Sequence, residues 1–143
     1  MITVCRRLTF CAGHRVYGHE SKCANLHGHN YVVFIHARSP ELDSLGRVVD
    51  FSVLKDTIGS WIDSFWDHGF LVSNEDPFRL VLLNDIKQKW YLMDNPTAEN
   101  MAKRLLITAN DLLKDTPVQV FKVVLWETEN CFAEVTLDTP PVA

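Results

Sequence analysis

Three histidines in the first 30 residues have the types and spacing of a metal site. His27 and His29 lie two residues apart in the segment Cys23-Ala24-Asn25-Leu26-His27-Gly28-His29. On an extended segment, residues two apart point to the same side, so both imidazoles can face one ion. His14 follows an earlier candidate strand, and an antiparallel neighbour would bring it to the pair. Three neutral histidine ligands leave one position open, which is typical of catalytic zinc.

The histidines also have interpretations other than a metal site. A lone His-x-His pair is more often exposed or hydrogen-bonded, but a third histidine and the nearby Cys23 favour a metal. Iron or nickel could use the same ligands, although zinc is the usual occupant. His19 is a possible ligand, yet its neighbour Glu20 suggests a solvated loop. His36 has the opposite strand parity from the pair, so we expect it to face away from the metal.

The cysteines fall into two groups. Cys23 could be a fourth zinc ligand, which would close the site. Alternatively it is a base or nucleophile, because a nearby cation and Lys22 could lower its pKa. The sequence leaves both roles open. Cys5, Cys11 and Cys131 lie in apolar or strand settings, and we expect them to be inert core thiols.

Several polar residues further along the chain are weaker candidates. Asp67 precedes His68, and an acid beside an imidazole can orient it and stabilise its protonated form. Such a pair is common by chance. Glu127, at a strand end, could be an ordinary solvated carboxylate. Thr97 and Glu99 could do no more than begin a helix.

Composition limits the class of protein. The chain has 143 residues, 47% hydrophobic and 22% charged, which predicts a single globular domain over 1–143. A net charge of -4 argues against a nucleic-acid partner. No apolar run is long enough to span a bilayer, so we expect no membrane partner. Four cysteines without an export signal favour free thiols and a cytoplasmic location.

Hydrophobic periodicity predicts the order strand, strand, helix, helix, strand, strand. The expected strands are 1–10, 29–38, 118–127 and 131–137, and the expected helices begin at the caps Asp50 and Thr97. Residues of about 70–95 form an insertion, with a short helix near 81–90. This order predicts an α+β fold in which two helices pack on one face of a four-stranded antiparallel sheet. The other face and the edges need cover, so we expect a homo-oligomer.

Six motifs occur in a fixed order along almost the whole chain. They are Phe10-Cys11-Ala12-Gly13-His14-Arg15, Cys23-x-x-x-His27-Gly28-His29-Asn30-Tyr31, Gly46-x-Val48-x-Asp50-Phe51, Asp67-His68, Pro96-Thr97-Ala98-Glu99-Asn100 and Glu127-Thr128. Together they resemble the family of 6-pyruvoyltetrahydropterin and 6-carboxytetrahydropterin synthases. The resemblance implies the ββααββ tunnelling fold, in which trimeric barrels stack into hexamers. It also implies that pterin sites lie between subunits.

The resemblance also implies roles for particular residues. It makes Zn²⁺ the cofactor and a small-molecule pterin the substrate. The zinc ligands would be His14, His27 and His29, the catalytic groups Cys23, Asp67 and His68, and the pterin-binding residues Glu127 and Thr97. The chain departs from the family pattern at Gly13, at Trp66 and in the 70–95 segment.

The implied substrate is 7,8-dihydroneopterin triphosphate, and the family forms two products from it. One branch keeps the side chain as a pyruvoyl group. The other releases acetaldehyde and leaves 6-carboxytetrahydropterin, an intermediate toward queuosine. The short gap between Cys23 and His27 resembles the carboxy-forming branch. The alternatives are the pyruvoyl-forming reaction, a zinc- or pterin-binding protein without turnover, and a structural zinc module closed by Cys23.

Overall fold

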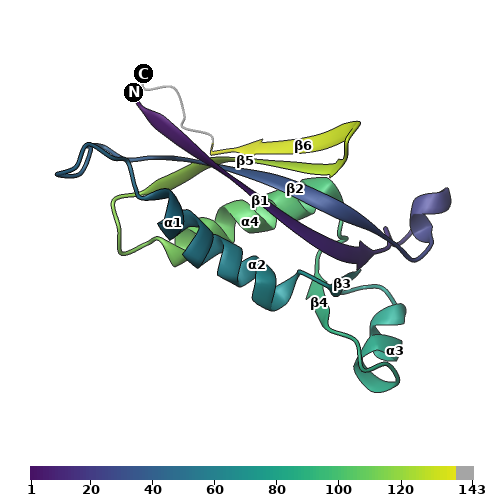
Figure 1. Cartoon of the computed structure of the whole chain (residues 1–143). Helices are drawn as coiled ribbons and strands as arrows, with labels where there is room; N and C mark the ends of the chain where they lie inside the picture. The colour runs from purple at the N-terminus through teal and green to yellow at the C-terminus, as the bar shows by residue number, and fades with distance from the viewer. Residues whose placement is uncertain (138–143) are drawn as a thin grey trace.

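A six-stranded mixed sheet forms the frame of the protein (Figure 1). The computed structural model describes residues 1–137. In spatial order the strands are β4 (Trp90–Met93), β3 (Gly69–Ser73), β1 (Thr3–His14), β2 (His27–Arg38), β5 (Gln119–Thr128) and β6 (Cys131–Thr136). Neighbours from β1 to β6 are antiparallel, whereas β3 and β4 join the other edge in parallel.

Alternation of side chains gives the sheet an inner and an outer face. In β1 the even positions Leu8, Phe10 and Ala12 are buried, as the sequence pattern predicts. In β2 the odd positions from Tyr31 onward are buried in the same core. Phe10 lies opposite Tyr31 in the register, and their rings stack with centroids 4.9 Å apart. The register therefore fixes which residues share the inner face.

The helix that Asp50 was predicted to cap covers part of this inner face. The Asp50 side chain accepts a hydrogen bond from the backbone N–H of Ser52 at 2.9 Å. The helical stretch runs through α1 (Phe51–Leu54), a π-helical turn (Lys55–Gly59) and α2 (Ser60–Phe65). Its apolar stripe of Leu54, Ile58 and Ile62 is buried.

The second long helix, α4 (Ala98–Leu112), begins as the sequence predicts. Thr97 is its N-cap, and the Thr97 hydroxyl accepts a hydrogen bond from the backbone N–H of Asn100 at 3.1 Å. Met101 and Leu105 are fully buried. Both long helices lie on the same side of the sheet (Figure 1), so the expected arrangement of helices on one face is confirmed.

The expectation of four strands is wrong, because the segment 70–95 supplies two more. β3 pairs in parallel with the end of β1, from Ala12 to His14, and β4 pairs in parallel with β3. Between them lies the helix α3 (Phe78–Asn84), which begins and ends earlier than the predicted helix. β3 is a short apolar run without alternation, and its parallel partner is distant in sequence, so local periodicity does not reveal it.

The expectation that three cysteines are core thiols is also wrong. Cys5, Cys11 and Cys131 are exposed, whereas Cys23 is half-buried, and all four thiols are free. Cys5 and Cys11 occupy odd positions of β1, and these positions lie on the outer face. Cys5 and Cys11 therefore lie in a strand, but their side chains are not on its inner, buried face.

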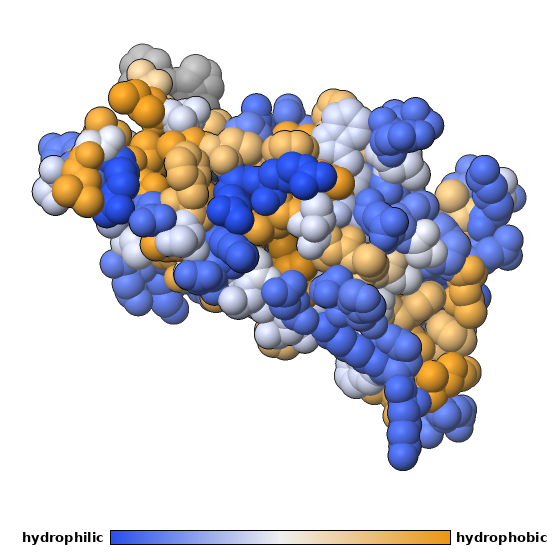
Figure 2. Space-filling view, in the orientation of Figure 1, coloured by the Kyte–Doolittle hydropathy of each residue, from blue (hydrophilic) through white to orange (hydrophobic). Residues whose placement is uncertain are grey.

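The outer face of the sheet carries apolar side chains that the helices do not cover. Val32, Phe34 and Trp126 are half-buried there, and Phe132 is exposed. The rings of Trp126 and Phe132 lie 4.5 Å apart. A second hydrophobic area lies over α3, beside hydrophilic residues, where Leu80 and other side chains are exposed (Figure 2). Within residues 1–137, no helix is both long and apolar enough to span a membrane.

Candidate metal centre

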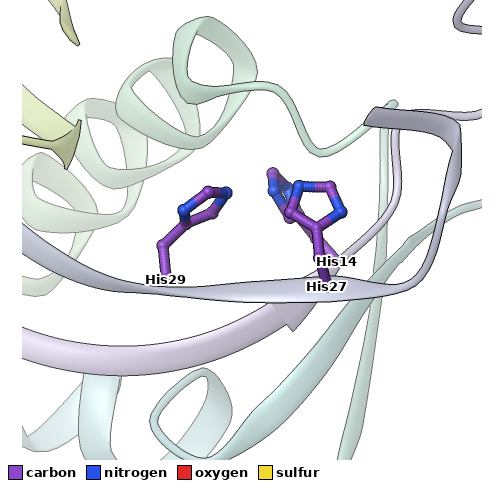
Figure 3. Close-up of side chains that lie close together, drawn as sticks. All are labelled: His14, His27 and His29. Carbon is purple, nitrogen blue, oxygen red and sulfur yellow. The ribbon is translucent and has the colours of Figure 1, made fainter. Parts of the chain in front are cut away.

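Three histidines converge where β1 ends and β2 begins (Figure 3). His14 is the last residue of β1 and pairs in the register with His27, the first residue of β2. His29 follows two positions later on the same face. The ring centroids are 4.6 Å apart for His14 and His27, 5.1 Å for His14 and His29, and 4.9 Å for His27 and His29. One nitrogen from each lies within 4.8 Å of the others, a spacing that suits one metal ion.

Backbone carbonyls set the tautomers of two of these imidazoles. Nδ1 of His14 lies 2.7 Å from the carbonyl oxygen of Pro96, and Nδ1 of His27 lies 2.6 Å from that of Asn25. A carbonyl oxygen can only accept, so each Nδ1 carries the proton. The lone pair then remains on Nε2. This is the usual way in which proteins orient a histidine for a metal.

His29 carries a polar atom that the described residues leave without a hydrogen bond. Its Nε2 is buried and has no hydrogen-bond partner within residues 1–137. Oε1 of Glu127 is 3.6 Å away, beyond hydrogen-bond distance. A buried nitrogen without a partner is costly, and coordination to a cation would satisfy it. The three residues therefore fit a Zn²⁺ ion on their own chemistry.

Burial favours the neutral form of His14 and of His29, which is the form that binds a metal. Burial lowers the pKa of His14 to about 4, in spite of the hydrogen bond to Pro96. Burial also lowers the pKa of His29, and the Glu127 carboxylate opposes that shift only in part. Neutral imidazole binds a cation without first losing a proton, so the centre is ready for metal at neutral pH.

Tyr31 belongs to the surroundings of the centre, although the sequence analysis gave it no role. Its hydroxyl lies 3.4 Å from both ring nitrogens of His14. Burial raises the pKa of Tyr31, so the hydroxyl keeps its proton. The sequence signal was strand parity, since Tyr31 lies two residues after His29 and shares its face.

Glycine is required where the two strands meet beside the histidines. A Cβ atom at Gly28 would lie 3.0 Å from the carbonyl oxygen of Ala12 and 3.5 Å from the Cα atom of Gly13. Both neighbours are backbone atoms, which have little freedom to move. The absence of a side chain at Gly28 therefore allows β1 and β2 to carry His14, His27 and His29 to one point.

Glu127 and Thr97 lie around this centre. Glu127 is at a bulge in β5, between Trp126 and Thr128, and its carboxylate is next to His29. Thr97 directly follows Pro96, whose carbonyl oxygen accepts the hydrogen bond from His14. The structure thus brings both predicted pterin-binding residues toward the metal centre.

Cys23 is not a member of the three-histidine group. It is in a short 3₁₀ turn, Lys22–Ala24, in the connection between β1 and β2. Its backbone carbonyl accepts a hydrogen bond from Val16 at 2.9 Å. Its thiol is not part of the group of ligand atoms within 4.8 Å of one another. The structure does not bring Cys23 to the fourth ligand position, and His19 is likewise outside the group.

Asp67 and His68 form a pair at the other side of β1. Oδ2 of Asp67 lies 2.9 Å from Nδ1 of His68, and Oδ1 accepts a hydrogen bond from the backbone N–H of Cys11 at 2.9 Å. Burial favours the neutral carboxyl, but the hydrogen bonds from Cys11 and His68 hold the pKa of Asp67 below its ordinary value. The carboxylate is therefore ionised and fixed beside an exposed imidazole.

The Asp67–His68 pair and the three histidines lie on opposite faces of the sheet. The Cys11 thiol, close to the pair, donates to Oδ1 of Asn30 at 3.1 Å. Cys11 and Asn30 are opposite each other in the register and point outward, whereas His14 and its partners point inward. One chain therefore does not bring its relay pair to its own metal centre.

Two further polar residues, His36 and Arg15, contact other side chains of the fold and are not part of the metal centre. His36 lies on the outer face, as its parity predicts, with Nε2 3.7 Å from the thiol of Cys5. Arg15 follows the ligand His14, and its guanidinium binds both carboxylate oxygens of Asp76, at 2.5 and 2.6 Å. The Asp76 side chain is fully buried. Asp76, which no sequence motif singles out, ties the end of β1 to the segment before α3.

Comparisons with known proteins agree on one family. A family model described as 6-pyruvoyl tetrahydropterin synthase matches residues 3–138. A 6-carboxy-5,6,7,8-tetrahydropterin synthase of Rickettsia felis is 40% identical, over 94% of this chain and 100% of the relative. A protein of the same name from Aquifex aeolicus is 33% identical, over 92% of this chain and 95% of the relative.

Solved structures agree with the fold. A protein from Wolinella succinogenes superposes with a TM-score of 0.84 at 24% identity, covering 96% of this chain and 98% of that one. The 6-pyruvoyl tetrahydropterin synthase of Caenorhabditis elegans superposes with a TM-score of 0.70 at 23% identity, covering 96% of each chain. At these identities the likeness concerns the fold alone.

Proposed function

Because this chain belongs to the 6-pyruvoyl tetrahydropterin synthase family, we propose that it is a zinc-dependent 6-carboxy-5,6,7,8-tetrahydropterin synthase. It would convert 7,8-dihydroneopterin triphosphate into 6-carboxytetrahydropterin, acetaldehyde and triphosphate, a step toward queuosine. Two observations support the carboxy product over the pyruvoyl product. Relatives at up to 40% identity bear that name, and only three residues separate Cys23 from His27.

The observation that carries the proposal is the convergence of His14, His27 and His29. Their Nε2 atoms would hold Zn²⁺, and the fixed tautomers of His14 and His27 prepare the site for it. When bound, zinc would supply a Lewis acid for the hydroxyl groups of the substrate side chain. Three protein ligands leave a position for such an oxygen, as in other catalytic zinc sites.

Glu127 would hold the pterin ring. Its side chain is 25% exposed, and Oε1 of Glu127 lies 3.6 Å from Nε2 of His29. A carboxylate in this state can accept two hydrogen bonds, from the pterin amino group and from a ring N–H. Ligands without those donors would leave the carboxylate unpaired and would be rejected. Thr97, at the start of α4, would line the same pocket.

Cys23, Asp67 and His68 would move protons between the carbons and oxygens of the side chain. Asp67 holds Nδ1 of His68, which leaves Nε2 of His68 to exchange protons. The triphosphate would leave by elimination. Because the relay pair and the metal centre lie on opposite faces, a second subunit would be needed to complete the site. That need supports a homo-oligomer, a trimer or a hexamer, with active sites between subunits.

Two other functions remain as alternatives. A 6-pyruvoyltetrahydropterin synthase would eliminate triphosphate from the same substrate and keep the three-carbon side chain, and the description of the matching family model favours it. A zinc- or pterin-binding protein without turnover would need the histidines and Glu127. It would have no use for Cys23, Asp67 and His68 together.

Product analysis separates these functions. Zinc-loaded protein would be given 7,8-dihydroneopterin triphosphate, and the products would be identified by mass, with Cys23→Ala beside the wild type. We expect 6-carboxytetrahydropterin and acetaldehyde from the wild type and neither from Cys23→Ala. A pyruvoyl product would favour the first alternative. Zinc binding without any product would favour the second.

A further inference from the structure

We propose a second metal site, on the outer face of the sheet, formed by Cys11, Asp67 and His68. One ligand atom from each residue, namely the thiol, a carboxylate oxygen and an imidazole nitrogen, lies within 4.8 Å of the other two. The three residues are not contiguous, since Cys11 is in β1 and the pair precedes β3. Nothing in the family resemblance gives Cys11 a role, and the proposal does not depend on the proposed reaction.

The backbone holds these groups in a fixed relation. The backbone N–H of Cys11 donates to Oδ1 of Asp67 at 2.9 Å, and the carbonyl oxygen of Cys11 accepts from the backbone N–H of His68 at 2.6 Å. Cys11 is thereby bonded to both partners through its own main chain. The site needs only side-chain rotations to close around an ion, because its three Cα atoms are already set.

His68 has an uncommon backbone conformation at this site. Its φ angle is 60°, and within residues 1–137 it is the only residue other than glycine with a positive φ. An L-residue in this region is strained and is held there by its surroundings. Here the bond to Cys11 holds it. The left-handed turn keeps the imidazole beside the Asp67 carboxylate.

The kinds of donor decide which cations fit. A thiolate with an imidazole and a carboxylate suits zinc, cobalt or cadmium, whereas magnesium and calcium prefer oxygen ligands throughout. Oδ1 of Asn30, 3.1 Å from the Cys11 thiol, offers a fourth donor. Binding would release the thiol proton to the solvent, because the thiolate is the ligand.

Positive groups close to the site lower its expected affinity for a cation. Arg7 lines the same shallow pocket as Cys11, Asn30 and Asp67. The Lys89 ammonium group donates to the backbone carbonyl of Asp67 at 2.6 Å. These charges oppose a cation, and the outer site is more exposed than the three-histidine centre. We therefore expect the outer site to fill second, after the three histidines.

A metal ion in the outer site would block proton transfer by Asp67 and His68. An ion there would use Asp67 and His68 as ligands, so they could not transfer protons. This consequence alone rests on the proposed function. Excess zinc would then inhibit the wild type, and Cys11→Ser would resist that inhibition.

Titration of metal-free protein with Co²⁺ tests the site directly. Cobalt bound to a thiolate gives a charge-transfer absorption that a site of three histidines cannot give. We expect two Co²⁺ ions to bind per chain, with the absorption rising only as the second one binds. In Cys11→Ser the absorption should be lost and the second ion should bind about tenfold more weakly or worse.

Three further variants keep the result unambiguous. Cys131→Ser removes an exposed thiol elsewhere and should leave both ions and the absorption unchanged. Cys23→Ser should also retain the absorption, which separates the outer site from a role of Cys23 as a ligand. His68→Asn, a residue type that tolerates a left-handed backbone, should weaken the second ion as Cys11→Ser does. Binding of a single ion, no thiolate absorption, its survival in Cys11→Ser, or its loss in Cys23→Ser would overturn the proposal.

Discussion

Nδ1 of His14 lies 2.7 Å from the carbonyl oxygen of Pro96, a residue 82 positions further along the chain. This contact joins the end of β1 to the residue before the N-cap of α4. It therefore couples the orientation of one proposed metal ligand to the packing of the longest helix. The metal centre is not a local loop feature but depends on the folded sheet and helix together.

Glu127→Gln should separate pterin binding from metal binding. The amide keeps the shape of the side chain but replaces one acceptor oxygen with a donor, which would face the donors of the pterin ring. We expect the KM for 7,8-dihydroneopterin triphosphate to rise by a factor of about 100 or more, with the zinc content unchanged. Glu129→Gln, at the exposed turn between β5 and β6, is the matched control. An unchanged KM in Glu127→Gln would remove Glu127 from the substrate site.

Gly28→Ala should disturb the metal centre without removing a ligand. The added Cβ would lie 3.0 Å from the carbonyl oxygen of Ala12, so β1 and β2 must separate between His27 and His29. We expect zinc affinity to fall about tenfold or more, measured by competition with a chelator. Gly59→Ala is the control, because its Cβ would meet side-chain atoms of Leu8 and Lys55 at 3.5 to 3.6 Å, an ordinary contact. Equal zinc affinity in both variants would contradict the close approach.

The stability of the metal-free protein should depend on pH through His14. Burial lowers the pKa of His14 from 6.5 to about 4, so between these values the unfolded chain binds a proton that the folded chain does not. The contribution of neutral His14 to the free energy of unfolding is complete above pH 6.5 and is lost as the pH falls toward 4. Its full size is about 3 kcal/mol.

Denaturant unfolding of metal-free protein at pH values from 7.5 down to 4.5 measures this dependence. These values cover most of the range between the pKa of His14 in the unfolded chain and its pKa in the folded chain. His14→Gln cannot titrate, so its free energy of unfolding should fall less steeply than that of the wild type. Parallel curves for the two proteins would show that His14 titrates alike in the folded and unfolded chains.

Asp76→Asn should destabilise the fold. Asp76 is fully buried, accepts two hydrogen bonds from the Arg15 guanidinium and also accepts from the backbone N–H of Phe78. The amide removes the charge and keeps only one acceptor oxygen for the Arg15 guanidinium, at an expected cost of about 2 to 3 kcal/mol in the free energy of unfolding. Asp43→Asn removes an exposed partner of Arg47, and should cost no more than about 1 kcal/mol. Similar losses in the two variants would contradict a structural role for Asp76.

Much of the candidate site could be predicted from the sequence because its geometry follows from strand parity. His27 and His29 share a face through their two-residue spacing, and an antiparallel pairing of β1 with β2 delivers His14. The cap at Thr97 was also predictable, since it depends on neighbouring residues alone. The same parity places Cys11 on the outer face, although the apolar setting of the strand had suggested a core thiol.

The features that the sequence did not reveal depend on partners far along the chain. β3 and β4 form through parallel pairing with distant strands, and neither shows its own alternation. The bond between Arg15 and Asp76 spans 61 positions and has no local signature. The left-handed turn at His68 likewise depends on its contact with Cys11. Such contacts exist only once the sheet has formed.

Titration of metal-free protein with zinc, with acetaldehyde release from 7,8-dihydroneopterin triphosphate measured at each step, tests the central claim most directly. We predict no activity without zinc and a linear rise that reaches its maximum at one zinc ion per chain. His29→Ala should remain inactive at that ratio, whereas His36→Ala, on the outer face, should follow the wild type. Full acetaldehyde release by metal-free protein, or by His29→Ala, would contradict the assignment of a catalytic zinc centre to His14, His27 and His29.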